Sequence, residues 1–121
     1  MAETTKRAFD AMLGAMRPGA KARQVYAAWQ QVVDDAGLQH YRRHHCGYCV
    51  WIGLSPSWTG GNKVVGLRHD SEMEIRGEMS FHVLSWLMGT GYGDYFISNA
   101  ALLGAKGPEV LTRTPAGPIV R

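Results

Sequence analysis

The chain has 121 residues, of which 45% are hydrophobic and 19% are charged, and its formal net charge is +3. These values exclude a mainly disordered chain, and the length fits one domain, which we expect to span residues 1–121. No apolar run approaches the ~20 residues that a bilayer span needs, and the first residues lack a hydrophobic signal-peptide core, so we expect a cytoplasmic protein.

The basic residues do not form one stripe. The 13 Lys and Arg residues outnumber the 10 Asp and Glu residues, but they fall in short groups such as Lys6-Arg7 and Arg42-Arg43. Nothing in the sequence is typical of a helix-turn-helix, a zinc finger or an aromatic RNA-binding strand pair. We therefore expect no nucleic-acid partner and no membrane partner. Two cysteines are too few for a disulfide scaffold.

Two amphipathic helices are predicted in the first third of the chain. Residues 4–16 place apolar side chains three and four positions apart, and Thr4 or Thr5 is a suitable N-cap. A second apolar stripe runs from about Ala22 to Ala36. Gly37 is the expected end of that helix, because glycine readily adopts the left-handed conformation that closes a helix.

The rest of the chain is predicted to form strands and turns. Aromatic and β-branched residues indicate strands over Cys46–Leu54, Ser80–Leu87 and Phe96–Leu103, with a shorter extended piece over Glu109–Thr112. Glycine, proline and small polar residues indicate loops over residues 55–62 and 88–94, and residues 70–75 fit a turn or an edge strand. This order predicts an α+β fold, in which two N-terminal helices pack on one face of a curved, mainly antiparallel sheet.

The segment His44-His45-Cys46-Gly47-Tyr48-Cys49 contains two thiols at the spacing of a metal clamp or a redox pair. A closed zinc site needs four ligands, and the sequence has no second C-x-x-C. On an extended strand His44 and His45 point to opposite faces, and Cys46 and Cys49 also diverge. We therefore favour cysteines that act as small buried hydrophobes, with a metal or redox site as the alternative.

His82 is flanked by apolar residues in SFHVLSW. Its imidazole suits general acid and base chemistry, but a structural histidine with a hydrogen-bond partner fits the same position. Tyr48, Trp51, Trp58 and Trp86 offer ring faces to a compact ligand, and they are equally suited to a core.

Several motifs occur in a fixed order that resembles a known family. These are MRPGAKARQVYAAWQQVVDDAGL, HHCGYCVWIGLSPSWTGGN, IRGEMSFHVLSW, ISNAALLGAKGPEVLT and TPAGPIVR. Over residues 9–121 the series resembles the C-terminal part of the catalytic domain in the creatinase, prolidase and methionine aminopeptidase superfamily, which implies half of a pita-bread fold. The pattern is most similar to the Xaa-Pro peptidase-like branch that includes ectoine hydrolase, through Gly47, Tyr48, Ile52, Gly53, Pro56, Trp58, Gly77, Met79, Phe81 and His82.

The resemblance also implies a site of two divalent metals, held by two aspartates, one histidine and two glutamates. In the family's order the aspartates lie on strands that come before residue 1. The family histidine falls on Tyr48, the glutamates fall on Leu84 and Asn99, and a second histidine that contacts substrate falls on about Ser55. Because these residues are poor ligands for a hard divalent cation, we expect no metal and no other cofactor.

Creatinase hydrolyses a C–N bond in this fold without a metal, using a histidine as acid and base. By that resemblance we expect a peptidase or amidohydrolase fragment that acts on an Xaa-Pro peptide or an ectoine-like amide, with His82, Tyr48 and His45 as catalytic residues and Trp58, Trp86 and Pro56 as substrate-binding residues. The alternative is a non-catalytic module that binds a partner or dimerises, because half of a shared core would expose apolar surface and a sheet edge. The expected partners are a small-molecule or dipeptide substrate and a second copy of the chain.

Overall fold

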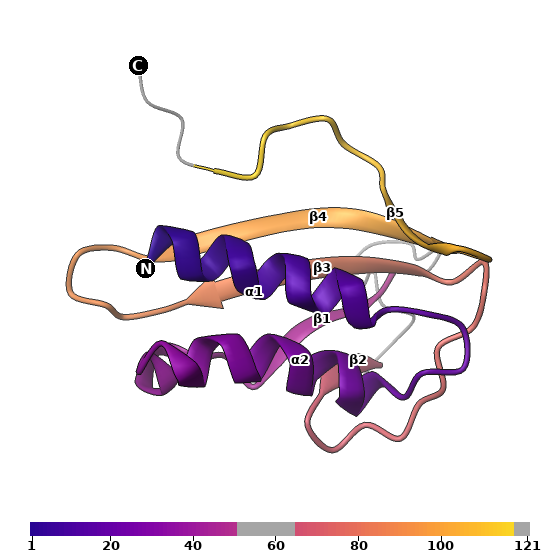
Figure 1. Ribbon diagram of the computed structural model, residues 1–121, viewed down its shortest axis with the longest axis horizontal. Helices are drawn as coiled ribbons and strands as arrows, with labels where there is room; N and C mark the ends of the chain where they lie inside the picture. The colour runs from indigo at the N-terminus through magenta and orange to yellow at the C-terminus, as the bar shows by residue number, and fades with distance from the viewer. Residues whose placement is uncertain (51–64, 118–121) are drawn as a thin grey trace, which may run out of the picture.

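Helices and strands form two layers in the computed structural model, which describes residues 1–50 and 65–117 (Figure 1). The described elements, in chain order, are α1 (Ala2–Ala15), α2 (Ala22–Asp35), a short 3-10 helix (Gln39–Tyr41), β1 (His45–Cys49), β2 (Gly66–Arg68), β3 (Ser80–Leu87), β4 (Tyr95–Gly104) and β5 (Gly107–Val110). The strands form one antiparallel sheet in the order β2-β1-β3-β4-β5. This arrangement confirms the α+β prediction.

The two helices lie side by side across one face of the sheet (Figure 1). Their apolar stripes are fully buried there, because helical residues three and four apart share one face. The core between the layers is formed by Ala8, Phe9, Met12, Val25, Trp29 and Val33 from the helices and by Cys46, Leu67, Phe81, Val83 and Leu87 from the sheet. The indole Nε1 of Trp29 donates a buried hydrogen bond of 2.9 Å to the Ser85 hydroxyl, which links α2 to β3.

The helix ends differ in part from the sequence prediction. Met1 is the N-cap of α1, and Thr5 lies inside the first turn, where its hydroxyl donates to the Met1 carbonyl. The predicted Thr4 or Thr5 cap was therefore wrong. Helix α2 begins at Ala22 as predicted, with the Gln24 side chain accepting from the Lys21 amide, and Gly37 follows its end with φ +70°.

The strands agree with the sequence most closely where the apolar pattern is longest. β3 has the predicted bounds, and β4 is one residue longer at each end than predicted. β5 begins at Gly107, before the predicted Glu109, because it pairs with β4 through a tight turn at Gly104 and Gly107, and it ends at Val110. β1 covers the start of the predicted strand at 46–54, while the remainder of that strand from residue 51 and the predicted loop at 55–62 lie outside the described residues.

A bulge in β1 changes which side chains share a face. His45 pairs with Arg68 and Tyr48 pairs with Gly66, so β1 carries one extra residue between these two pairs. Gly47 sits at the bulge with φ +155°, and a Cβ there would lie 2.6 Å from the carbonyl oxygen of His82. The bulge places His45 and Tyr48 on the same face of the sheet.

The same bulge corrects the prediction that the two cysteines diverge. Cys46 lies in the core under the helices, and Cys49 packs against that core from the same side. An extra residue between them restores a common side to positions that a regular strand would turn apart.

Candidate functional site

The candidate site lies on the face of the sheet that is turned away from α1 and α2, which we call the distal face. Phe81 and Val83 point into the core, so alternation places the residues between them on the other side, and directly paired residues of antiparallel strands share a face. The distal face therefore carries His45, Tyr48, Ser80, His82, Leu84, Trp86, Phe96, Ser98, Ala100 and Leu102.

Two of the predicted catalytic residues form a pair across adjacent strands. Tyr48 of β1 and His82 of β3 are directly opposite each other, and the Tyr48 hydroxyl and His82 Nδ1 share a hydrogen bond of 2.7 Å. Their ring centroids lie 5.0 Å apart in an edge-to-face arrangement. The bond engages one nitrogen of the imidazole and leaves Nε2 for a ligand. Burial lowers the pKa of His82, which favours the neutral ring at neutral pH.

The third predicted catalytic residue, His45, lies beside this pair. Its ring centroid is 6.2 Å from that of Tyr48, and its buried Nδ1 has no hydrogen-bond partner among the described residues. Burial lowers the pKa of His45 to about 4, and the positive charges of His44 and Arg43 act in the same direction. The imidazole is therefore neutral over the physiological range.

The prediction that His44 and His45 point to opposite faces was wrong. His44 precedes β1, so strand alternation does not apply to it. The two rings instead meet edge to face, with centroids 4.8 Å apart.

Trp86 shares the distal face but lies away from the Tyr48–His82 pair. It follows His82 by four residues along β3, which corresponds to roughly 13 Å. Its indole Nε1 donates to Asp94 at 2.9 Å, its ring meets Phe96 edge to face, and the Arg43 guanidinium lies 4.7 Å from its ring centroid. A contact between Arg43 and the distal face was not predicted from the sequence. Its position in a run of basic residues just before β1 could have indicated it.

The other predicted substrate-binding residues, Trp58 and Pro56, lie outside the described residues, as do Trp51 and Ser55. The described part of the site therefore consists of His82, Tyr48 and His45 close together, with Trp86 farther along the same face.

The thiols have the character of buried apolar groups. The Cys46 Sγ lies 3.7 Å from the Leu67 carbonyl oxygen, and the Cys49 Sγ lies 3.8 Å from the Met73 sulfur. Burial raises the pKa of both thiols, which disfavours the thiolate that metal binding and redox chemistry require. This environment supports the interpretation of the cysteines as small hydrophobes.

The positions that the family resemblance assigns to metal ligands do not converge. Tyr48 and Leu84 lie on the distal face, but Asn99 pairs with Val83 and bonds through its amide to Thr112. The residue opposite Leu84 is Ser98. Within residues 1–50 and 65–117 no three His, Cys, Asp or Glu side chains gather as metal ligands would. These residues do not fit a centre of two divalent metals.

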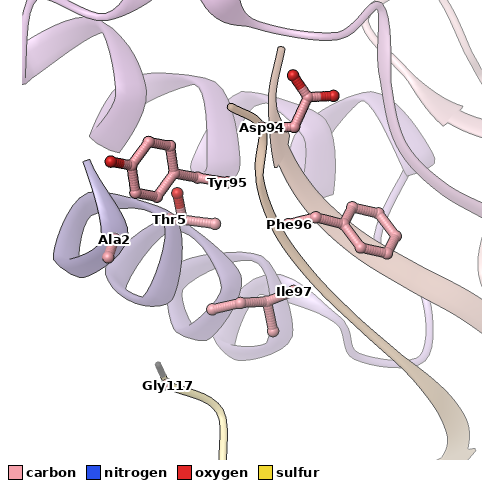
Figure 2. Close-up of a pocket in the computed structure, with 7 residues that line it drawn as sticks. All are labelled: Ala2, Thr5, Asp94, Tyr95, Phe96, Ile97 and Gly117. Carbon is pink, nitrogen blue, oxygen red and sulfur yellow. The ribbon is translucent and has the colours of Figure 1, made fainter. Parts of the chain in front are cut away.

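A separate hollow lies between the first turn of α1 and the start of β4 (Figure 2). It has a volume of about 230 Å³ and is lined by Ala2, Thr5, Asp94, Tyr95, Phe96, Ile97 and Gly117. Asp94 is the one charged residue in its lining, and its two carboxylate oxygens accept from the Trp86 indole and the Gly89 amide. The hollow therefore offers little chemistry of its own.

Comparisons with known proteins agree on one family. The family model of metallopeptidase family M24 matches residues 1–102. The uncharacterized hydrolase/peptidase y4tM of Sinorhizobium fredii is 27% identical over 116 residues, which cover 94% of this chain and 28% of that protein.

Solved structures share the fold. The dipeptidase PepE from Mycobacterium ulcerans superposes with a TM-score of 0.80 at 24% identity, over 96% of this chain and 29% of that one. The prolidase from Pyrococcus furiosus superposes with a TM-score of 0.78 at 19% identity, over 93% of this chain and 32% of that one. These matches confirm the predicted pita-bread fold, and the chain spans less than a third of the length of each protein.

Proposed function

The chain belongs to metallopeptidase family M24, and from that premise we propose that it supplies the Tyr48–His82 part of a hydrolase site that cleaves a C–N bond in a small substrate without a metal. At the family level it is a peptidase-like hydrolase. The substrate class that we propose is an Xaa-Pro peptide or an ectoine-like amide, and the proposed location is the cytoplasm. No helix of the described residues is long and apolar enough to cross a membrane.

The observation that carries the proposal is the hydrogen bond between Tyr48 and His82. A neutral imidazole with one nitrogen held by a phenol presents its other nitrogen in a fixed direction, as general acid–base catalysis requires. In the proposed reaction His82 takes a proton from water as the water oxygen forms a bond to the carbonyl carbon. The same imidazole returns that proton to the nitrogen as the C–N bond breaks.

His45 supports the pair in this proposal by keeping the pocket uncharged beside Tyr48. Its pKa of about 4 keeps the ring neutral, so it does not repel a proton arriving on His82. Trp86, with Trp58 and Pro56, is proposed to contact the apolar part of the substrate.

The test is an assay of Xaa-Pro dipeptide and ectoine hydrolysis by the protein expressed from its complete gene. We expect His82→Ala to remove most turnover while the fold is retained, and we expect His40→Ala, which changes an exposed histidine in the 3-10 helix, to leave it unchanged. Equal turnover in the His82→Ala variant and the wild type would remove His82 from the mechanism.

A second candidate is a non-catalytic module that associates with a second copy of itself. The residues at the family's metal positions favour it, because Tyr48, Leu84 and Asn99 are poor ligands for a hard cation. Exposed apolar side chains on the distal side of β4 favour it as well. Light scattering over a concentration series separates the candidates, since a monomer that turns over substrate contradicts the second one.

A further inference from the structure

A basic cavity lies where the chain passes from the end of α2 into β1, separate from the Tyr48–His82 pair. Its volume is about 490 Å³, within the range of roughly 300–1,000 Å³ that small-molecule sites occupy. None of the seven residues that line it is acidic, and four of them are Arg42, Arg43, His44 and His69. The hollow is thus open to solvent and lined by basic side chains with no carboxylate among them.

The sequence and the fold together bring arginines and histidines to this corner. Five of the six residues from 40 to 45 are His or Arg. Pairing of β1 with β2 sets Arg68 opposite His45 and brings His69 to the same corner. The described acidic partners are few: Asp34 accepts from Arg42 at 3.2 Å, and Asp70 pairs with Arg68 at 3.2 Å. The charge of this corner is therefore only partly compensated.

The donors that line the cavity are held by their surroundings. The Tyr26 hydroxyl donates to the Arg43 carbonyl at 3.0 Å and fixes one wall, and the Tyr26 and His69 rings lie 6.2 Å apart. One N–H of Arg42 is bonded to Asp34, and a guanidinium has five N–H donors, so Arg42 retains donors for a ligand. Gln30 also donates to Asp34, which steadies that carboxylate beside Arg42.

We propose that this cavity binds a small molecule through an oxyanion, a phosphate or a carboxylate group, held by Arg42, His44 and His69. A guanidinium forms charge-assisted hydrogen bonds to such oxygens, and an imidazole N–H donates to them as well. This binding is independent of the proposed hydrolase activity.

The test is calorimetric titration of the full chain with inorganic phosphate and with citrate, at constant ionic strength set by sodium chloride. We expect saturable binding of at least one of the two anions. The anion with the lower dissociation constant shows whether the cavity prefers a phosphate or a carboxylate group. Arg42→Gln is expected to weaken binding about tenfold or more, since a charge-assisted hydrogen bond is lost. Arg7→Gln, the same substitution on an exposed position of α1, is the matched control and should bind as the wild type does.

A second variant keeps the test decisive if Arg42→Gln disturbs the fold. His69 is exposed after β2, and His69→Gln should weaken binding several-fold while melting like the wild type. The proposal is overturned if phosphate and citrate give no heat beyond that of chloride, if Arg7→Gln weakens binding as much as the cavity variants do, or if only an oligonucleotide binds.

Discussion

Position 47 demands glycine for two separate reasons. Its φ of +155° is strained for any L side chain, and an added Cβ would lie 2.6 Å from the His82 carbonyl oxygen and 3.0 Å from Leu67. The contacted oxygen belongs to the strand backbone, so it cannot move away as a flexible side chain would. Gly47 therefore determines the bulge that brings His45 and Tyr48 to the same face.

We expect Gly47→Ala to lower the free energy of unfolding by about 2–3 kcal/mol, because overpacking and backbone strain add at this position. Urea unfolding followed by tryptophan fluorescence measures the change. Gly14→Ala is the matched control: Gly14 lies on α1 with open space around it, and the same substitution there should stabilise the protein by roughly 0.5–1 kcal/mol. A Gly47→Ala variant as stable as the wild type would show that the bulge tolerates a side chain.

His45 should make the protein sensitive to mild acid. Burial lowers its pKa from 6.5 to about 4 in the folded state, so below the unfolded value the unfolded chain binds a proton that the folded chain does not. Stability conferred by the neutral ring is therefore full above 6.5 and is lost as the pH falls from 6.5 towards 4. His82, whose pKa burial also lowers, acts with the same sign.

Between about pH 7 and about pH 4.5 we expect His45 to account for a loss of roughly 1–2 kcal/mol, a value reduced for screening at a half-buried site. Urea midpoints across this range should fall less steeply in His45→Gln than in the wild type. His40→Gln removes an exposed imidazole from the 3-10 helix and serves as the control, with the wild-type slope. Identical slopes in all three proteins would exclude His45 as the acid-sensitive group.

At the scale of elements, α2 and β3 are joined by one buried polar contact. The Trp29 indole donates to Ser85 in a mainly apolar core, so removing the hydroxyl leaves a buried N–H without an acceptor. We expect Ser85→Ala to cost about 1–3 kcal/mol, the usual penalty for an unsatisfied buried donor. Chemical unfolding of Ser85→Ala, Trp29→Phe and the double variant measures it.

The double variant should be more stable than the sum of the two single changes predicts, because it removes both partners of the bond. Strict additivity would mean that the hydroxyl and the indole do not interact.

Helices and strands were predictable from the sequence where the pattern of apolar and polar residues along the chain determines the secondary structure. β3 has the predicted bounds because every second residue from Phe81 to Leu87 is buried in the core along the whole strand. The α1 cap was mispredicted because two threonines offered capping side chains, while the apolar stripe extends the helix past them. Residue patterns alone do not reveal the β1 bulge, since its position depends on the pairing with β2 and β3.

In the candidate site, too, the sequence identified individual residues but not the contacts that depend on strand pairing. His82 and Tyr48 were identified individually from motifs, but their hydrogen bond depends on the register between β1 and β3. The placement of Leu84 and Asn99 on opposite faces likewise depends on the register between β3 and β4, because a shift of one residue moves a side chain to the other face of a sheet. In the sequence, the basic residues around the cavity are separated along the chain. The pairing of β2 with β1 brings Arg68 and His69 close to the residues that follow α2.

At the scale of the whole molecule, the two faces of the sheet differ in kind. One face is covered by α1 and α2 (Figure 1), whereas the distal side of β4 and the following residues expose Phe96, Leu102 and Leu111 at 49%, 38% and 55%. Pairing places Phe96 opposite Trp86 and Leu102 opposite Ser80, so both lie on the distal face, and Leu111 donates to Ala100 beside them. Phe96 lies six residues before Leu102, roughly 20 Å along the strand, so Leu102 and Leu111 form the apolar patch and Phe96 lies apart from it. An exposed apolar patch is typical of a surface that another protein covers.

We therefore expect the chain to self-associate through the distal face, with a mass that rises towards that of a dimer as concentration increases in light scattering. Leu102→Lys places a charge beside Leu111 on this face and should raise the dissociation constant about tenfold or more, because a charged side chain opposes the burial of the apolar contacts around it. Tyr92→Lys is the matched control, since Tyr92 is 90% exposed in the loop before β4, away from the patch. A mass that stays monomeric at every concentration, or an equal effect of the two lysine variants, would contradict association through this face and leave the hydrolase proposal standing alone.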